Sequence, residues 1–85
     1  MNTFFALMAE YGTCYIPLSR CAHLFGLTPE EAARRANRLQ LPVPTFRAGS
    51  QKSPWLVDAG QLATYLDDLR LKATEEWQKV RGSRM

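Results

Sequence analysis

The stretch that decides the fold is residues 16–52, which read IPLSRCAHLFGLTPEEAARRANRLQLPVPTFRAGSQK. Its first part, residues 18–25, has apolar residues at three- to four-residue spacing and predicts a short helix. Gly26 follows, and a glycine there can adopt the left-handed conformation that ends many helices. A second helical pattern begins only two residues later, so a tight turn must join the two helices.

The second helix has the clearest N-terminal signal in the sequence. Thr28 is a favoured N-cap residue, Pro29 fits the first helical position, and Glu31 lies where it can complete a capping box. We expect this helix to run to Leu39. A helix, a tight turn and a second helix of this length are typical of a helix-turn-helix.

The two sides of the second helix differ in size and polarity. Ala32, Ala36 and Leu39 share the side expected to face the first helix, where small alanines permit a close approach. The other side carries long polar side chains that can reach the edges of bases. These are Glu30, Arg34, Asn37 and Arg38.

Prolines exclude a helix after this point. Pro42 and Pro44 make residues 41–47 extended. A basic loop with Gly and Ser follows at residues 48–53, and residues 55–57 return as a strand. The sequence therefore predicts a mainly α fold with a small β-hairpin wing, a winged helix-turn-helix.

The segments on either side complete one small domain. Residues 1–12 are apolar and fit either a helix capped by Asn2 or Thr3 or a strand, because both periodicities are present. Residues 13–16 suit an edge strand. Asp58 caps a last helix whose apolar spacing continues beyond what a compact core needs. Within a single domain at 1–85 we therefore expect an N-terminal segment (1–12), the helix-turn-helix (18–39), the wing (41–57) and a C-terminal helix (58–81).

Composition excludes several classes of protein. Eighty-five residues, 46% of them hydrophobic, indicate one globular domain. No apolar run approaches the roughly 20 residues that span a bilayer, and no signal peptide is evident, so we expect a cytoplasmic protein without a membrane partner. Cys14, Cys21 and His23 are too few for a structural zinc site, so no metal or other cofactor is expected. No nucleophile motif or phosphate loop indicates an enzyme.

Positive charge is concentrated in the predicted helix-turn-helix and wing. Residues 18–52 hold six basic and two acidic side chains, whereas the rest of the chain holds five basic and six acidic ones. A polyanion such as double-stranded DNA is therefore the expected partner.

Arg34 and Arg38 lie one turn apart and could bind guanine or phosphate, while Asn37 suits adenine. The i,i+4 pairs Glu30–Arg34 and Glu31–Arg35 are too weak to withhold these arginines from DNA. Phe46 and Trp55 are expected in the core of the wing, not as base-stacking platforms. The expected DNA-contacting residues are Arg20, Thr28, Arg34, Arg35, Asn37, Arg38, Arg47, Ser50, Gln51 and Lys52.

One module of this size should bind DNA weakly and discriminate poorly between sequences, so we also expect a homodimer or a higher homo-oligomer. The alternative is that the N-terminal segment folds back over the helix-turn-helix and Trp77 covers one edge. The residues expected to mediate self-association are Phe4, Phe5, Leu7, Met8, Leu69, Ala73, Trp77 and Val80.

Six short motifs extend over nearly the whole chain. They are MAEY (8–11), IPL (16–18), LTP (27–29), LPVP (41–44) with Arg47, SQK (50–52) and LATYLD (62–67). In this order they resemble the pyocin activator PrtN family. The resemblance implies a DNA-binding transcriptional activator of bacteriocin or prophage genes, which could also contact RNA polymerase.

Two other functions fit the same pattern. The layout is also similar to phage excisionases, which bend DNA, and to the DNA-binding domains of MerR-type regulators. A protein-binding adaptor that uses both ends of the chain is a third possibility, from a different class.

Overall fold

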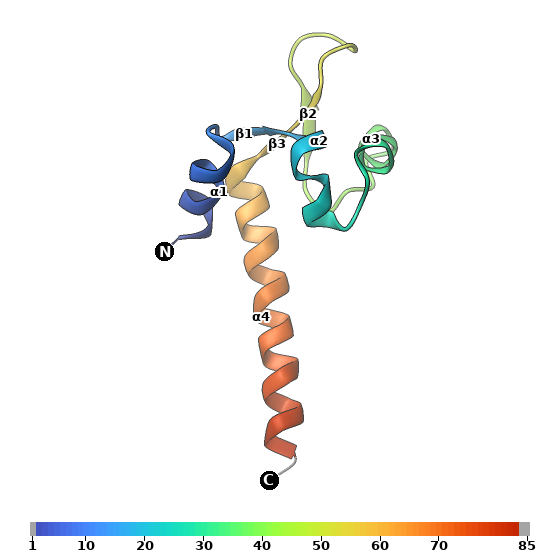
Figure 1. The fold of residues 1–85 in the computed structure, drawn as a ribbon. Helices are drawn as coiled ribbons and strands as arrows, with labels where there is room; N and C mark the ends of the chain where they lie inside the picture. The colour runs from blue at the N-terminus through green and yellow to red at the C-terminus, as the bar shows by residue number, and fades with distance from the viewer. Residues whose placement is uncertain (1, 84–85) are drawn as a thin grey trace.

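The computed structural model describes residues 2–83 as a small head from which one long helix projects (Figure 1). We call residues 2–67 the head and residues 68–83 the stalk. The elements in order are α1 (Thr3–Tyr11), β1 (Tyr15–Pro17), α2 (Leu18–Cys21), the 3-10 helix η1 (Ala22–Phe25), α3 (Pro29–Asn37), β2 (Thr45–Arg47), β3 (Trp55–Asp58) and α4 (Ala59–Ser83).

A three-stranded antiparallel sheet organises the head. Its strand order is β1-β3-β2, so β3 is central and β1 is an edge strand, which begins and ends later than the predicted residues 13–16. Val57 of β3 pairs with Ile16 on one side and Thr45 on the other. The sheet and the helices around it confirm the winged helix-turn-helix architecture, with β1 added to the predicted hairpin.

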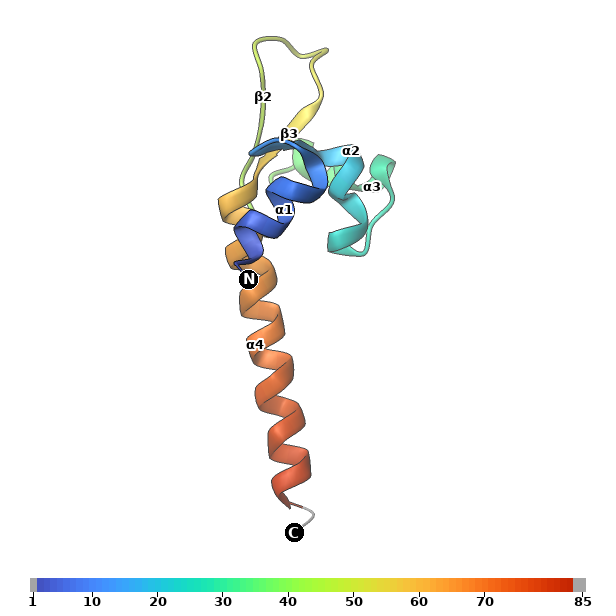
Figure 2. The same ribbon diagram turned by 60° about the vertical axis from the view of Figure 1, so that its left-hand side comes forward.

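The N-terminal segment is a helix, not a strand. The Asn2 side chain accepts a hydrogen bond from the Phe4 amide at 2.8 Å, and Gly12 ends the helix at φ 74°. Leu7 is buried, and α1 lies beside the first turns of α4 (Figure 2). The segment thus folds back, but chiefly onto α4 and not over the helix-turn-helix as the alternative proposed, and Trp77 is 58% exposed and does not cover an edge.

The predicted single helix over residues 18–25 is wrong in its second half. Cys21 has φ −114° and ψ 6°, which breaks the α-helix, and the chain continues as η1. Gly26, at φ 73°, ends η1 in the left-handed conformation, as expected. Burial raises the pKa of the Cys21 thiol to about 11, so this thiol is an inert part of the core.

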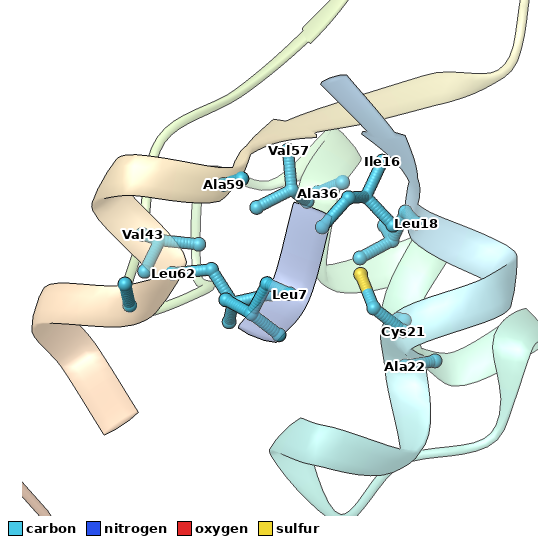
Figure 3. Packing of buried hydrophobic residues seen from close by; sticks show 12 residues of the cluster. Leu7, Ile16, Leu18, Cys21, Ala22, Ala36, Val43, Val57, Ala59 and Leu62 are labelled. Carbon is cyan, nitrogen blue, oxygen red and sulfur yellow. The ribbon is translucent and has the colours of Figure 1, made fainter. Parts of the chain in front are cut away.

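The core lies where the sheet meets α2, α3 and the start of α4 (Figure 3). Ile16, Val57 and Leu62 are its largest fully buried side chains. Ala32 and Ala36 bury the inner side of α3 completely, as their small size predicted. The closely packed helices of the predicted helix-turn-helix therefore depend on alanines.

The last helix begins at a side-chain cap and soon leaves the head. Asp58 accepts hydrogen bonds from the amides of Gly60 (2.7 Å) and Gln61 (3.2 Å). Leu62 is buried and Leu66 half-buried, whereas residues 67–82 are all exposed. Only the first two turns contribute to the core, as the sequence indicated.

Residues 2–83 contain no helix long and apolar enough to cross a bilayer. Within the same residues, the histidine, cysteine and acidic side chains do not gather in groups of three or more that could hold a metal ion.

We predict that Leu62→Ala destabilises the domain by about 2–5 kcal/mol, because the substitution leaves a cavity where the sheet meets α4. Leu71→Ala, the same change at a 58% exposed position of α4, should alter stability by less than about 0.5 kcal/mol. Urea denaturation monitored by circular dichroism measures both. Equal effects of the two substitutions would contradict this account of the core.

Candidate nucleic-acid interface

Helix α3 begins with one of the two hydrogen bonds of the predicted capping box. The Thr28 hydroxyl accepts a hydrogen bond from the Glu31 amide at 3.2 Å. The Glu31 carboxylate does not return to the Thr28 amide, because it binds two arginines further along the helix. Thr28, expected to contact DNA, is thus committed to capping α3.

Glu31 holds both neighbouring arginines of α3. Its carboxylate accepts from Arg34 Nε at 3.0 Å and from Arg35 Nε at 3.3 Å. Arg34 therefore pairs with Glu31 in place of the predicted Glu30. The hydrogen bond from Arg34, which has the larger effect, and the one from Arg35 both lower the pKa of Glu31. Because the pKa of Glu31 is lowered in the folded protein, the carboxylate is charged and both pairs persist at neutral pH. The pairs weaken only as the pH falls through the lowered pKa of Glu31, which lies below the ordinary glutamate pKa of about 4.3.

The C-terminus of α3 differs from the prediction. The helix ends at Asn37, and Leu39 adopts a left-handed conformation with φ 56°. The amides of Leu39 and Gln40 bond the carbonyls of Ala36 (3.1 Å) and Arg35 (2.8 Å). These are the two hydrogen bonds of a Schellman motif, which normally places glycine where Leu39 lies.

Two predictions fail at this end of α3. Leu39 is 85% exposed, so its expected place on the inner side with the two alanines is wrong. Arg38 caps the helix and so lies beyond its last turn. Arg34, Arg35 and Arg38 are nonetheless all exposed, and within residues 2–83 Arg38 has no acidic partner.

The loop of the wing is ordered by two serines. The Ser53 hydroxyl donates to the Ala48 carbonyl at 2.7 Å, and Ser50 Oγ accepts from the Lys52 amide at 3.2 Å. The two hydroxyls also lie 3.3 Å apart. Ser50 therefore shapes the turn, whereas Gln51 and Lys52 are exposed at its tip.

Arg47 joins the wing to α3. Its guanidinium carbon lies 4.3 Å from the centre of the Trp55 ring, across the β2–β3 pair. Its Nη2 donates to Asn37 Oδ1 at 3.4 Å, although ten residues separate the two. Arg47 thus positions the wing and leaves less of its guanidinium for DNA than predicted. No local pattern signals this contact, because stacking on Trp55 depends on the register of the hairpin.

The aromatic residues of the wing lie on different faces of the sheet. Trp55 is half-buried under Arg47, as expected for a core residue of the wing. Phe46 is 41% exposed and packs edge-on against Tyr15, with ring centres 5.8 Å apart. The prediction that Phe46 is buried is wrong, because its strand position directs it to the outer face.

The remaining predicted residues are not brought together. The Arg20 guanidinium carbon lies 5.4 Å from the centre of the Tyr11 ring of α1, and among residues 2–83 Arg20 forms no ion pair with an acidic residue of α3 or the wing. Leu7 is a core residue, so its predicted place at an interface between copies is wrong. Phe4 and Met8 are half-buried against the core, while Phe5 is 64% exposed. The others, Leu69, Ala73, Trp77 and Val80, are exposed on the stalk.

The chain matches the model of a known family. The model of the family described as "Pyocin activator protein PrtN" matches residues 3–73, which include the whole helix-turn-helix and wing. This family comprises regulators and is not a family of enzymes. No curated protein and no solved structure matches the chain.

We predict that Arg47→Lys destabilises the domain by about 1–2 kcal/mol although it preserves the charge, because lysine lacks the flat group that stacks on Trp55. Arg38→Lys is the matched control and should be neutral. Thermal denaturation measures stability, and Trp fluorescence reports the environment of the ring. If Arg47→Lys is as stable as Arg38→Lys, Arg47 does not position the wing.

Proposed function

Because the chain belongs to the pyocin activator protein PrtN family, we propose that it regulates pyocin genes as an activator that binds double-stranded DNA through α3 and the wing. The observation that carries this proposal is the link between Asn37 and Arg47. It joins the exposed arginines of α3 and the basic wing into one surface.

The surface carries side chains suited to contacts with both the bases and the phosphates of DNA. Arg34 projects from the outer side of α3, from which it can reach guanine in the major groove. Arg38, beyond the last turn, is better placed for a phosphate. Because Asn37 accepts from Arg47 through its oxygen, its amide nitrogen stays able to donate.

The wing supplies a second contact to the backbone of DNA. The loop is held by Ser50 and Ser53, so Gln51 and Lys52 can reach a phosphate without the whole loop having to order on binding. Helix α4 leaves the head on the side away from the wing loop (Figures 1 and 2). The stalk therefore does not obstruct this surface.

We predict that Arg34→Ala costs about 1–3 kcal/mol of binding and relaxes the preference for one base pair. Arg38→Ala should weaken binding to all DNA sequences by a similar amount. It should also reduce the slope of log affinity against log salt concentration by about one, because one phosphate contact is lost. Arg20→Ala removes an equal charge on the α1 side of the head and should have little effect. Footprinting on promoter DNA of pyocin genes, repeated at several salt concentrations, measures each. An unchanged footprint after Arg34→Ala and Arg38→Ala together would remove α3 from the recognition role.

Glu31 should act as a brake on DNA binding, since it competes with phosphate for two arginines. We expect Glu31→Gln to raise the affinity for DNA about threefold and to steepen its dependence on salt. Glu30→Gln removes the same charge from the same turn, but Glu30 holds no arginine within residues 2–83, so its effect should be smaller. Equal gains from both substitutions would show that only net charge matters.

Activation is tested separately from binding. A reporter carrying the footprinted site should give higher output with this protein than without it. Strong bending of DNA together with integrase-dependent recombination, and no rise in output, would identify an excisionase-like architectural protein instead. Absence of salt-dependent DNA binding would favour the protein-binding adaptor.

A further inference from the structure

The stalk carries apolar side chains that the head does not cover. Leu69 is 46%, Trp77 58% and Val80 53% exposed. Together with Ala73 they form the apolar stripe, because at 100° per residue all four fall within about 80° of one side of the helix. Leu71, also 58% exposed, lies on the opposite side.

The charge pattern and length of the stalk point to a partner helix. Residues 68–83 extend about 24 Å at 1.5 Å per residue, and helices in proteins gain most of their stability from packing of an apolar face. Within residues 2–83 the charged side chains of the stalk form no ion pair with each other or with the head. Arg81 lies over the ring of Trp77, its guanidinium carbon 4.8 Å from the ring centre, and the other charged side chains are available to a second helix.

We propose that the partner is a second copy of this chain, and that the two stalks pair antiparallel with their two-fold axis between Ala73 and Thr74. This inference concerns α4 alone and goes beyond the proposed function. Ala73 at the centre lets the helices approach closely. On either side of it, Leu69 of one copy packs against Trp77 of the other.

The head excludes the parallel alternative. Leu62 and Leu66 continue the apolar stripe toward the N-terminus of α4, and there the head itself covers that side. In a parallel pair both heads would occupy the same space between the helices. In the antiparallel pair the two heads lie at opposite ends. Each stalk then packs along the part of the other stalk that no head covers.

The charges beside the apolar stripe complement each other in this register. In an antiparallel two-fold pair, a given flank of one helix meets the same flank of the other. Lys72 then comes beside Glu76 of the second copy. Asp67, whose Oδ1 accepts a hydrogen bond from the Thr3 hydroxyl at 2.6 Å, comes beside Arg81 through its other carboxylate oxygen. The symmetry repeats each contact, so four opposite-charge pairs flank the stripe.

Sedimentation of the free protein tests the proposal without DNA. We expect a dimer, which Leu69→Lys converts to monomer. Leu71→Lys, the same change on the opposite side of the stalk, should leave it dimeric. A monomeric wild-type protein at all concentrations, or equal effects of the two substitutions, would overturn the proposal whatever the outcome of the footprinting.

Cross-linking tests the direction of the helices. In a Cys14→Ser background, Ala73→Cys should form a disulfide-linked dimer on mild oxidation, because residue 73 lies near its own copy at the axis. Val80→Cys should not, since antiparallel pairing places the two copies of residue 80 about 20 Å apart along the helix. Efficient cross-linking at both positions would show a parallel pair and overturn the register. The native Cys21 thiol is buried and does not compete.

Charge reversal tests the pairs themselves. Lys72→Glu alone should weaken the dimer about tenfold, because two opposite-charge contacts become repulsive. Lys72→Glu combined with Glu76→Lys should restore it. A double variant no tighter than the single one would contradict the proposed register.

Discussion

The central position of β3 is the constraint on which the rest of the structure depends. This strand pairs with β1 and β2, so it joins the N-terminal part of the head to the wing. Trp55 at its start supports Arg47, Val57 fills the core, and Asp58 at its end caps α4. Four residues thus set the position of the wing and the direction of the stalk. A shift of one residue in their pairing would turn Val57 outward and misplace both.

Local patterns predicted the elements whose causes are local. The cap at Thr28, the glycine end at Gly26 and the alanine side of α3 could be read from the sequence because each depends on residues within one or two turns. The C-terminal end of α3 could not be predicted from the sequence, since Leu39 adopts the left-handed conformation that a Schellman motif usually assigns to glycine. The guanidinium of Arg47 is placed by Trp55 and Asn37, and both contacts depend on tertiary structure. The exposed arginines of the candidate interface were therefore predictable, but the residue that joins its two parts was not.

The acidic residue within the basic surface has a physical role. Two weak pairs to Glu31 hold the side chains of Arg34 and Arg35 toward the first turn of α3 in the absence of a ligand. The same pairs must be broken or shared when a phosphate arrives. Because each pair contributes only a few tenths of a kcal/mol, Glu31 lowers the affinity for DNA modestly and does not withhold the arginines from it.

Alanines on the inner side of α3 separate the requirements of folding from those of recognition. Ala32 and Ala36 are fully buried, and any larger residue there would force α3 away from α2. The outer positions of the helix make few contacts with the head, so their side chains can change at little cost to stability. Recognition of a new operator could therefore evolve through one or two substitutions on α3, while the scaffold beneath it stays unchanged.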